Sequence, residues 1–140
     1  MLAKEIHAKI QQNGFITFDE YMDMSLYFPK YGYYNSERTD FHPKNSDFIT
    51  APELSEIYTN SIVKFYTDSR KYKNIENVLE FGAGSGEMAY NFLKACNSKD
   101  LPRKYFIIEK NANLIKKQKN KLQKLPKNIF EKINWVDSSY

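Results

Sequence analysis

A carboxylate followed by alternate glycines is the feature of this sequence with the clearest chemical use. Residues 77–81 form an apolar run that carries an acid at Glu80, and three glycines follow at every second position, Gly82, Gly84 and Gly86. This pattern predicts a buried strand that turns sharply into a helix around a small molecule, because glycine tolerates a positive φ and lets a ligand approach the backbone. We therefore expect this segment to bind a nucleoside-like cofactor.

The spacing of the glycines narrows the choice of cofactor. The dinucleotide fingerprint G-x-G-x-x-G would place its last glycine at position 87, where the sequence has Glu87. A carboxylate there would also oppose a pyrophosphate at the helix N-terminus. A P-loop is excluded because no Lys-Ser or Lys-Thr pair follows the glycines. The pattern E-x-G-x-G-x-G that remains resembles the first motif of class I methyltransferases that use S-adenosylmethionine (SAM), although such turns also occur as purely structural loops.

A second acid follows the next apolar run. The apolar run at residues 104–108 is followed directly by Glu109, which lies 23 residues beyond Gly86. In α/β nucleotide-binding folds an acid about 20 residues after the glycines holds the ribose hydroxyls, and one carboxylate can accept from both hydroxyls of a diol. The alternative is that Glu109 or Asn111 caps the following helix. The two acids together favour the cofactor site.

Composition bounds the class of protein. The 140 residues suffice for one domain or a domain with part of another, and 41% of them are hydrophobic. The 21 basic and 17 acidic residues give a net charge of +4, too small to indicate nucleic-acid binding by itself. The sequence has no apolar run near 18 residues and no signal-peptide pattern, and Cys96 is its only cysteine, so we expect a cytoplasmic protein without disulfides. His7 and His42 have no ligand-like spacing, so we predict no metal site.

The hydrophobic patterns predict helices and then an alternation of strands and helices. Residues 2–13 form an amphipathic pattern closed by Gly14, and Thr17 to Glu20 reads as a capping box for a second helix. A second capping box from Thr50 to Glu53, with a proline in the first turn, predicts one long helix that continues through Tyr66. We further expect strands at 77–81, 104–108 and 133–136 and helices at 87–95 and 112–125, which gives an α/β fold with a parallel sheet.

The predicted helix at 112–125 is basic on one side. Its apolar side carries Leu114, Ile115, Gln118, Leu122 and Leu125, and five lysines lie elsewhere: Lys116, Lys117, Lys119, Lys121 and Lys124. Such a helix is usually a solvated outer surface, and a stripe that binds RNA is the alternative.

Several tracts together resemble the MidA family of SAM-dependent methyltransferases, which is related to the mitochondrial complex I assembly factor that methylates an arginine. The tracts are residues 21–29, 32–34, 47–53, 80–86 and 106–109. The resemblance implies a Rossmann-like class I methyltransferase fold. It divides the chain into an N-terminal helical extension, residues 1–73, and the first half of the SAM-binding domain, residues 74–140.

The motifs and the resemblance assign site residues. The cofactor-binding candidates are Glu80, Gly82, Ala83, Gly84, Gly86, Glu109 and, for the adenine amino group, Asp137. If the substrate is an arginine, its guanidinium needs a carboxylate, and the resemblance makes Asp47 and Glu53 the catalytic candidates. Helix capping is the competing role for Glu53, and a simple turn is the competing role for Asp137.

The resemblance also implies a sheet with more strands than the three predicted here. We expect an N-terminal fragment that is incomplete for catalysis, with an open apolar edge on its first strand that pairs with a second copy or a separately encoded C-terminal half. The expected substrate is a protein such as a complex I type subunit, and the alternative location is the mitochondrial matrix. The alternative functions are a non-catalytic SAM-binding or assembly module and an RNA-binding or RNA-modifying protein.

Overall fold

The computed structural model of the protein describes residues 2–35 and 49–136, which belong to two compact units, Met1–Asp40 and Phe41–Tyr140. The first unit contains α1 (Leu2–Asn13), α2 (Phe18–Tyr27) and a short 3-10 helix, η1 (Tyr33–Asn35). The second contains α3 (Ala51–Leu54), α4 (Glu56–Ser69), β1 (Asn77–Phe81), α5 (Glu87–Ala95), β2 (Lys104–Ile108), α6 (Ala112–Leu122), α7 (Lys127–Phe130) and β3 (Ile133–Val136).

The first unit folds as its capping signals predict. Gly14 follows α1 with a φ of 80°, a conformation that favours glycine. At the start of α2, Thr17 N–H donates to Glu20 Oε2 at 3.0 Å and the Thr17 hydroxyl accepts from Glu20 N–H at 3.4 Å, which is the predicted capping box. Lys9 Nζ lies 2.7 Å from Glu20 Oε1 and links the two helices.

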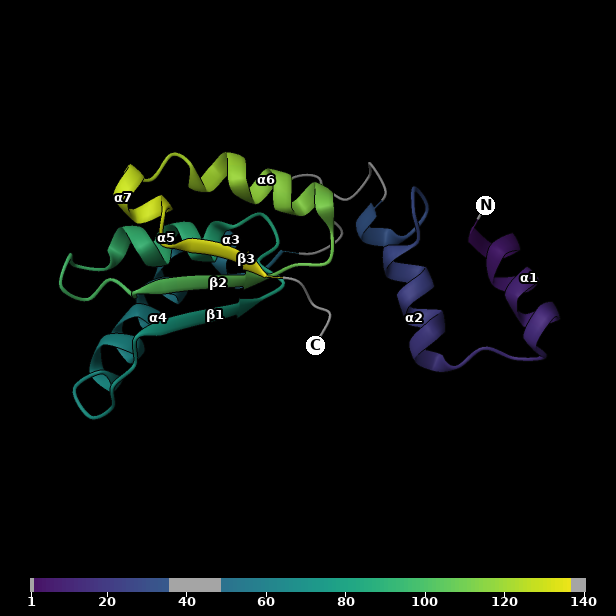
Figure 1. Ribbon diagram of the computed structural model, residues 1–140, viewed down its shortest axis with the longest axis horizontal. Coiled ribbons are helices and arrows are strands. Elements are labelled where there is room, and N and C mark those ends of the chain that lie inside the picture. The colour runs from purple at the N-terminus through teal and green to yellow at the C-terminus, as the bar shows by residue number, and fades with distance from the viewer. Residues whose placement is uncertain (1, 36–48, 137–140) are drawn as a thin grey trace. The chain divides into compact units, whose positions relative to one another are not determined.

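The second unit is built on a parallel sheet in the order β1-β2-β3, and Figure 1 shows the three strands side by side with their carboxyl ends at one edge. The strands have the predicted bounds. In the register, Leu79 lies beside Phe106 and Phe106 beside Asn134. Ligands of such sheets bind outside the carboxyl ends of the strands, so the site is expected at these ends.

The single long helix predicted from Thr50 through Tyr66 is wrong. The backbone at Ser55 is extended (φ −162°, ψ 142°), so α3 ends at Leu54 and α4 starts afresh at Glu56. The Ser55 hydroxyl accepts from Ile57 N–H at 3.1 Å and caps α4, whereas Thr50 makes no side-chain cap. Serine as an N-cap therefore overrides the continuous apolar pattern.

The end of the basic helix also differs from the prediction. Helix α6 stops at Leu122, and a separate short helix, α7, follows Pro126. Proline lacks the N–H that would continue the helical hydrogen bonds, so the chain restarts there instead.

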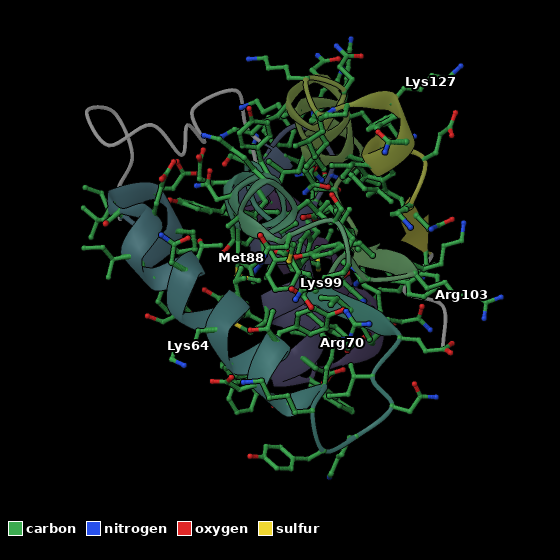
Figure 2. All side chains as sticks on the ribbon, turned by 90° about the vertical axis from the view of Figure 1, so that its left-hand side faces the viewer. Lys64, Arg70, Met88, Lys99, Arg103 and Lys127 are labelled. Atoms are coloured by element: carbon green, nitrogen blue, oxygen red, sulfur yellow. The ribbon has the colours of Figure 1, made fainter. Side chains whose placement is uncertain are left out.

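Helix α4 belongs to the same compact unit as the strands. Its Val63 and Tyr66 are buried in the core with Phe92 of α5, and Arg70, just beyond its end, donates from Nη1 to the carbonyl O of Lys99 at 3.4 Å. Figure 2 shows Arg70 and Lys99 close together and Lys64 pointing outward from α4. The boundary between the two compact units falls between residues 40 and 41, and the functional division at residues 73 and 74 stays a prediction.

The core covers one face of the sheet. Alternate side chains point to opposite faces of a strand, and Tyr105 and Ile107 of β2, both 0% exposed, pack with α4, α5 and Leu122 of α6. The other face carries Leu79 and Phe81, which are 50% and 73% exposed. One face therefore forms the core, and the other is largely open in the part of the chain that the structure describes.

Candidate functional site

The loop between β1 and α5 holds its three glycines in backbone conformations that favour glycine. Gly82, Gly84 and Gly86 have φ values of 63°, 54° and 84°, which L-residues with side chains rarely adopt. A Cβ added to Gly82 or Gly84 would meet no atom within 4 Å, whereas one added to Gly86 would lie 3.4 Å from Gln118 Cα. The first two glycines therefore border open space, and the third packs beside α6.

The loop is fixed to the sheet by its backbone. Gly82 N–H donates to the carbonyl O of Ile108 at 2.8 Å, and Gly86 N–H donates to that of Ala83 at 2.7 Å. The side chain of Ala83 is buried in the core, so only the backbone of Ala83 is available to contact a cofactor.

Glu80 is a buried acid at the end of β1. It is 8% exposed and accepts a hydrogen bond from the Tyr105 hydroxyl at 2.8 Å. Burial raises the pKa of Glu80 to about 7, and the negative charge of Glu109 adds to this effect, while the hydrogen bond from Tyr105 opposes it. Burial and the neighbouring Glu80 also raise the pKa of Tyr105. Glu80 therefore changes its charge near neutral pH.

Glu109 follows β2 and lies near enough to Glu80 for their charges to interact. Its Oε1 accepts from Asn111 N–H at 3.0 Å, and its Oε2 accepts from Gln118 Nε2 at 3.1 Å. The cap of α6 is Asn111, whose Oδ1 accepts from the N–H groups of Asn113 and Leu114. The two predicted cofactor acids thus lie at the carboxyl ends of adjacent strands, and Glu109 does not cap the helix.

Glu53 of α3 reaches the glycine loop, where it accepts a hydrogen bond from the Ser85 hydroxyl. Helix α3 and the glycine loop are therefore in contact, although 32 residues separate Glu53 from Ser85 in the sequence. Asp47 and Asp137, the remaining two predicted site residues, lie outside the described residues.

Gln118 is a site residue that the sequence analysis placed only on the apolar side of the helix. It is 0% exposed and bonds to Gly84 and Glu109 through its amide nitrogen and to Trp135 through its amide oxygen. A signal was present, because a glutamine spaced four residues from both Leu114 and Leu122 puts an amide in an apolar stripe, where it must find polar partners.

Two lysines of α6 make contacts within the unit. Lys121 pairs with Glu87 of α5, and Lys119 Nζ lies 5.2 Å from the centre of the Trp135 ring. The side chain of Lys119 thereby covers the Trp135 ring beside the candidate site.

Neither a metal-binding cluster nor a membrane-spanning helix occurs in residues 2–35 and 49–136. Nowhere in these ranges do three His, Cys, Asp or Glu side chains gather in a way that could hold a metal ion. Every helix there is too short or too polar to cross a bilayer.

Comparison with known proteins identifies the family. Residues 59–139 match the model of a family described as "Putative S-adenosyl-L-methionine-dependent methyltransferase", more than half of the chain. The chain belongs to this family. The predicted resemblance to MidA-type methyltransferases is confirmed, and SAM, the cofactor predicted from the glycine loop, is the one in the family's description.

Two curated relatives of this chain carry related names. The "Protein arginine methyltransferase NDUFAF7 homolog, mitochondrial" of Drosophila melanogaster is 35% identical over 96 residues, which are 66% of this chain and 22% of that protein. The "Protein arginine methyltransferase NDUFAF7, mitochondrial" of Xenopus tropicalis is 32% identical over 90 residues, 61% of this chain and 20% of that protein. The chain therefore spans about a fifth of the length of these relatives.

Two solved structures from Burkholderia thailandensis share the fold. One, bound to S-adenosyl-homocysteine (SAH), matches with a TM-score of 0.82 at 29% identity and covers 98% of this chain and 37% of its own. The other, a native structure, matches with a TM-score of 0.77 at 28% identity, over 99% of this chain and 35% of its own. They confirm the Rossmann-like methyltransferase fold that the sequence predicted.

Proposed function

We propose that this chain forms the cofactor site of a SAM-dependent methyltransferase that modifies a protein arginine. The observation that carries the proposal is the glycine loop flanked by Glu80 and Glu109 at the carboxyl ends of adjacent parallel strands. Small ligands of open parallel sheets bind at this position. Family membership and the SAH bound to the Burkholderia thailandensis protein support the same cofactor.

The residues of the site fit SAM. The loop backbone at Gly82 and Gly84 borders open space that any other residue would fill, which suits the methionine part of the cofactor. In the proposed roles, Glu80 faces its ammonium group, Glu109 holds the ribose and Asp137 contacts the adenine amino group. When bound, SAM supplies a methyl group carried on a positively charged sulfur.

The charge state of Glu80 controls its proposed role. An ionised carboxylate attracts an ammonium, and a protonated one does not. Because the pKa of Glu80 is raised to about 7, the free site holds this proton in part at neutral pH, and cofactor binding would release it. The hydroxyl of Tyr105 keeps one carboxylate oxygen oriented within the covered face.

Glu53 is the candidate for orienting the methyl acceptor. Its carboxylate accepts a hydrogen bond from Ser85 in the glycine loop. The competing role for Glu53 was in a capping box with Thr50, and the Thr50 side chain makes no cap. A carboxylate can hold a guanidinium in a bidentate pair and thereby direct one nitrogen. The names of the two curated relatives support arginine as the acceptor, and the family resemblance suggests a respiratory complex I type subunit. Asp47 remains a second candidate on the resemblance alone.

Calorimetric titration of the intact gene product with SAH tests the cofactor site. Gly84→Val should abolish SAH binding, because a β-branched residue is strained at a φ of 54° and its side chain fills the open space. Gly14→Val is the matched control, since Gly14 has a φ of 80° and also borders open space, but belongs to the first unit. Unchanged SAH affinity in the Gly84→Val protein would contradict the proposal.

A methylation assay separates the proposed enzyme from the alternatives. Mass spectrometry of a protein substrate incubated with SAM and the intact gene product should show one added methyl group on arginine, and Glu53→Gln should slow transfer while leaving SAH affinity unchanged. SAH binding without transfer to any substrate would favour a cofactor-binding or assembly module. RNA affinity that collapses as salt rises, without SAH binding, would favour an RNA-binding protein.

We also infer that the edge of β1 pairs with further polypeptide, either a second copy or a separately encoded half. β1 is an edge strand of the sheet, and its Leu79 and Phe81 are exposed. An apolar edge with unpaired backbone groups is a template for strand addition. Light scattering of the 140-residue chain should therefore show self-association, and a folded monomer at high concentration would contradict this expectation.

The cellular location is part of the same proposal. The single Cys96 suits a reducing compartment such as the cytoplasm, and the names of the two relatives favour the mitochondrial matrix. Fractionation of cells that express the intact gene product would decide between them.

A further inference from the structure

Gln118, in α6, joins three parts of the candidate site. Its Nε2 donates to the carbonyl O of Gly84 at 3.0 Å and to Oε2 of Glu109 at 3.1 Å, and its Oε1 accepts from Trp135 Nε1 at 2.9 Å. The side chain is 0% exposed, so each of these polar contacts forms away from water. An apolar residue of similar size would fill the same volume with no polar atom to satisfy, so packing alone does not explain a glutamine here.

The contact with Glu109 fixes the orientation of that carboxylate. One oxygen accepts from Asn111 N–H and the other from Gln118, so neither oxygen is free to rotate away. A carboxylate offers about four acceptor positions, and these two bonds leave capacity on each oxygen. That arrangement suits two neighbouring hydroxyls of one ribose, each donating to a different oxygen.

The contact with Gly84 fixes a peptide of the glycine loop. The peptide bond is planar and trans, so its C=O and N–H point in opposite directions. Because Gln118 holds the Gly84 carbonyl toward α6, the N–H of Ser85 points away from α6. Gly86 lies beside Gln118, since a Cβ there would be in van der Waals contact with Gln118 Cα and Cγ at 3.4 Å.

We infer that Gln118 is a positioning residue of the cofactor site, which sets the Glu109 carboxylate for the ribose hydroxyls and the Gly84–Ser85 peptide for the rest of the cofactor. This inference rests on the proposed function, because it requires an adenosyl ligand at Glu109. Its distinctive consequence is that Gln118 influences the recognition of the ribose hydroxyls indirectly, through Glu109.

The ratio of two dissociation constants tests this role. The intact gene product is titrated by calorimetry with SAH and with its 2′-deoxy analogue, and we expect the analogue to bind about tenfold more weakly, as for a lost hydrogen bond to a charged group. Gln118→Met keeps the volume and removes all three hydrogen bonds. It should weaken SAH binding about tenfold. It should also reduce the ratio of the two dissociation constants to about two, because the Glu109 carboxylate is no longer held in place.

Controls distinguish positioning from packing. Gln123→Met makes the same change at an exposed position just after α6 and should alter neither constant. If Gln118→Met does not fold, Gln118→Asn keeps an amide that is too short to reach both Gly84 and Glu109, and the same fall in the ratio is expected. A variant that weakens both ligands equally and keeps the original ratio would overturn the inference and leave the proposed function intact. Failure of the unaltered protein to bind SAH would overturn both.

Discussion

The two faces of the sheet have opposite characters, although the same three strands build both. On β1, Glu80 is 8% exposed, whereas the next residue, Phe81, is 73% exposed. Hydrophobicity alone predicts the reverse order. Helices α4, α5 and α6 cover the face that carries Glu80, Tyr105 and Ile107, and the face that carries Leu79 and Phe81 is largely open.

We infer from this difference that the two faces of the sheet have different roles. Burying an acid costs free energy, which appears here as a raised pKa, and such costs are common where a group must bind or react. An exposed apolar surface is common where a protein meets another polypeptide. The covered face thus carries the acids of the candidate site, and the open face fits the proposed pairing of β1 with another polypeptide.

The largest predicted effect compares two phenylalanines, one for each face. Phe92 is 1% exposed and its ring lies 5.3 Å from that of Tyr66 and 5.6 Å from that of Tyr105, so Phe92→Ala should reduce the free energy of unfolding by about 3–5 kcal/mol. Phe81→Ala should change it by less than about 0.5 kcal/mol in the 140-residue chain at concentrations low enough to keep it monomeric, because Phe81 is hydrated in the monomer. Urea unfolding of both variants measures the difference.

Equal losses in the two variants would break the comparison, because they would mean that both faces are covered. A concentration-dependent loss in the Phe81→Ala variant has a different meaning. It would show that the open face stabilises the chain only through association with another copy.

The elements of the covered face could be predicted from the sequence because their signals are local. The strands at 77–81, 104–108 and 133–136 and the helix at 87–95 have the predicted bounds, since short apolar runs and the glycine turn specify them without distant contacts. The two acids of the candidate site could be predicted from the same apolar runs. Glu80 and Glu109 needed only the strand ends, which parallel pairing brings to one edge.

The sequence did not predict what depends on contacts between distant residues. The start of α4 at Ser55 was missed, because Thr50 is the same type of N-cap residue and precedes the same apolar pattern. The bond from Ser85 to Glu53 spans 32 residues, and those of Gln118 to Gly84 and Trp135 span 34 and 17. No pattern in a single sequence specifies such pairs, whereas burial of an amide implies that partners exist.

The second predicted effect is the pH dependence of stability from the buried acid. Glu80 has a pKa of about 7 in the folded protein against its ordinary value of 4.5, so the folded protein retains a proton that the unfolded chain loses between these pH values. Its contribution to stability is present below pH 4.5 and is lost as pH rises through about 7. The loss should be about 3–4 kcal/mol, since the two pKa values differ by about 2.5 and each tenfold change in a proton equilibrium is worth about 1.4 kcal/mol.

Glu80→Gln isolates this contribution, because its amide stays neutral at every pH. Urea unfolding at pH 4.5 and pH 8 should show a smaller decrease for the Glu80→Gln variant than for the unaltered protein. Tyr105→Phe removes the hydrogen bond that opposes the rise in pKa, so its pH profile should move to higher pH. Identical profiles for Glu80→Gln and the unaltered protein would show that the buried carboxyl costs nothing, and the contrast with Phe81 would lose its energetic basis.

The smallest predicted effect concerns a helix that covers the buried face. Ser55 caps α4 through Ile57 N–H, so Ser55→Ala should cost about 1 kcal/mol of unfolding free energy. Thr50→Ala is the matched control, because Thr50 occupies the same position before α3 but makes no side-chain cap, and its cost should be a few tenths of a kcal/mol at most. Thermal unfolding of the two variants decides which residue starts the covering helix. A larger loss for Thr50→Ala would restore the single long helix and with it a capping role for Glu53 in place of its contact with Ser85.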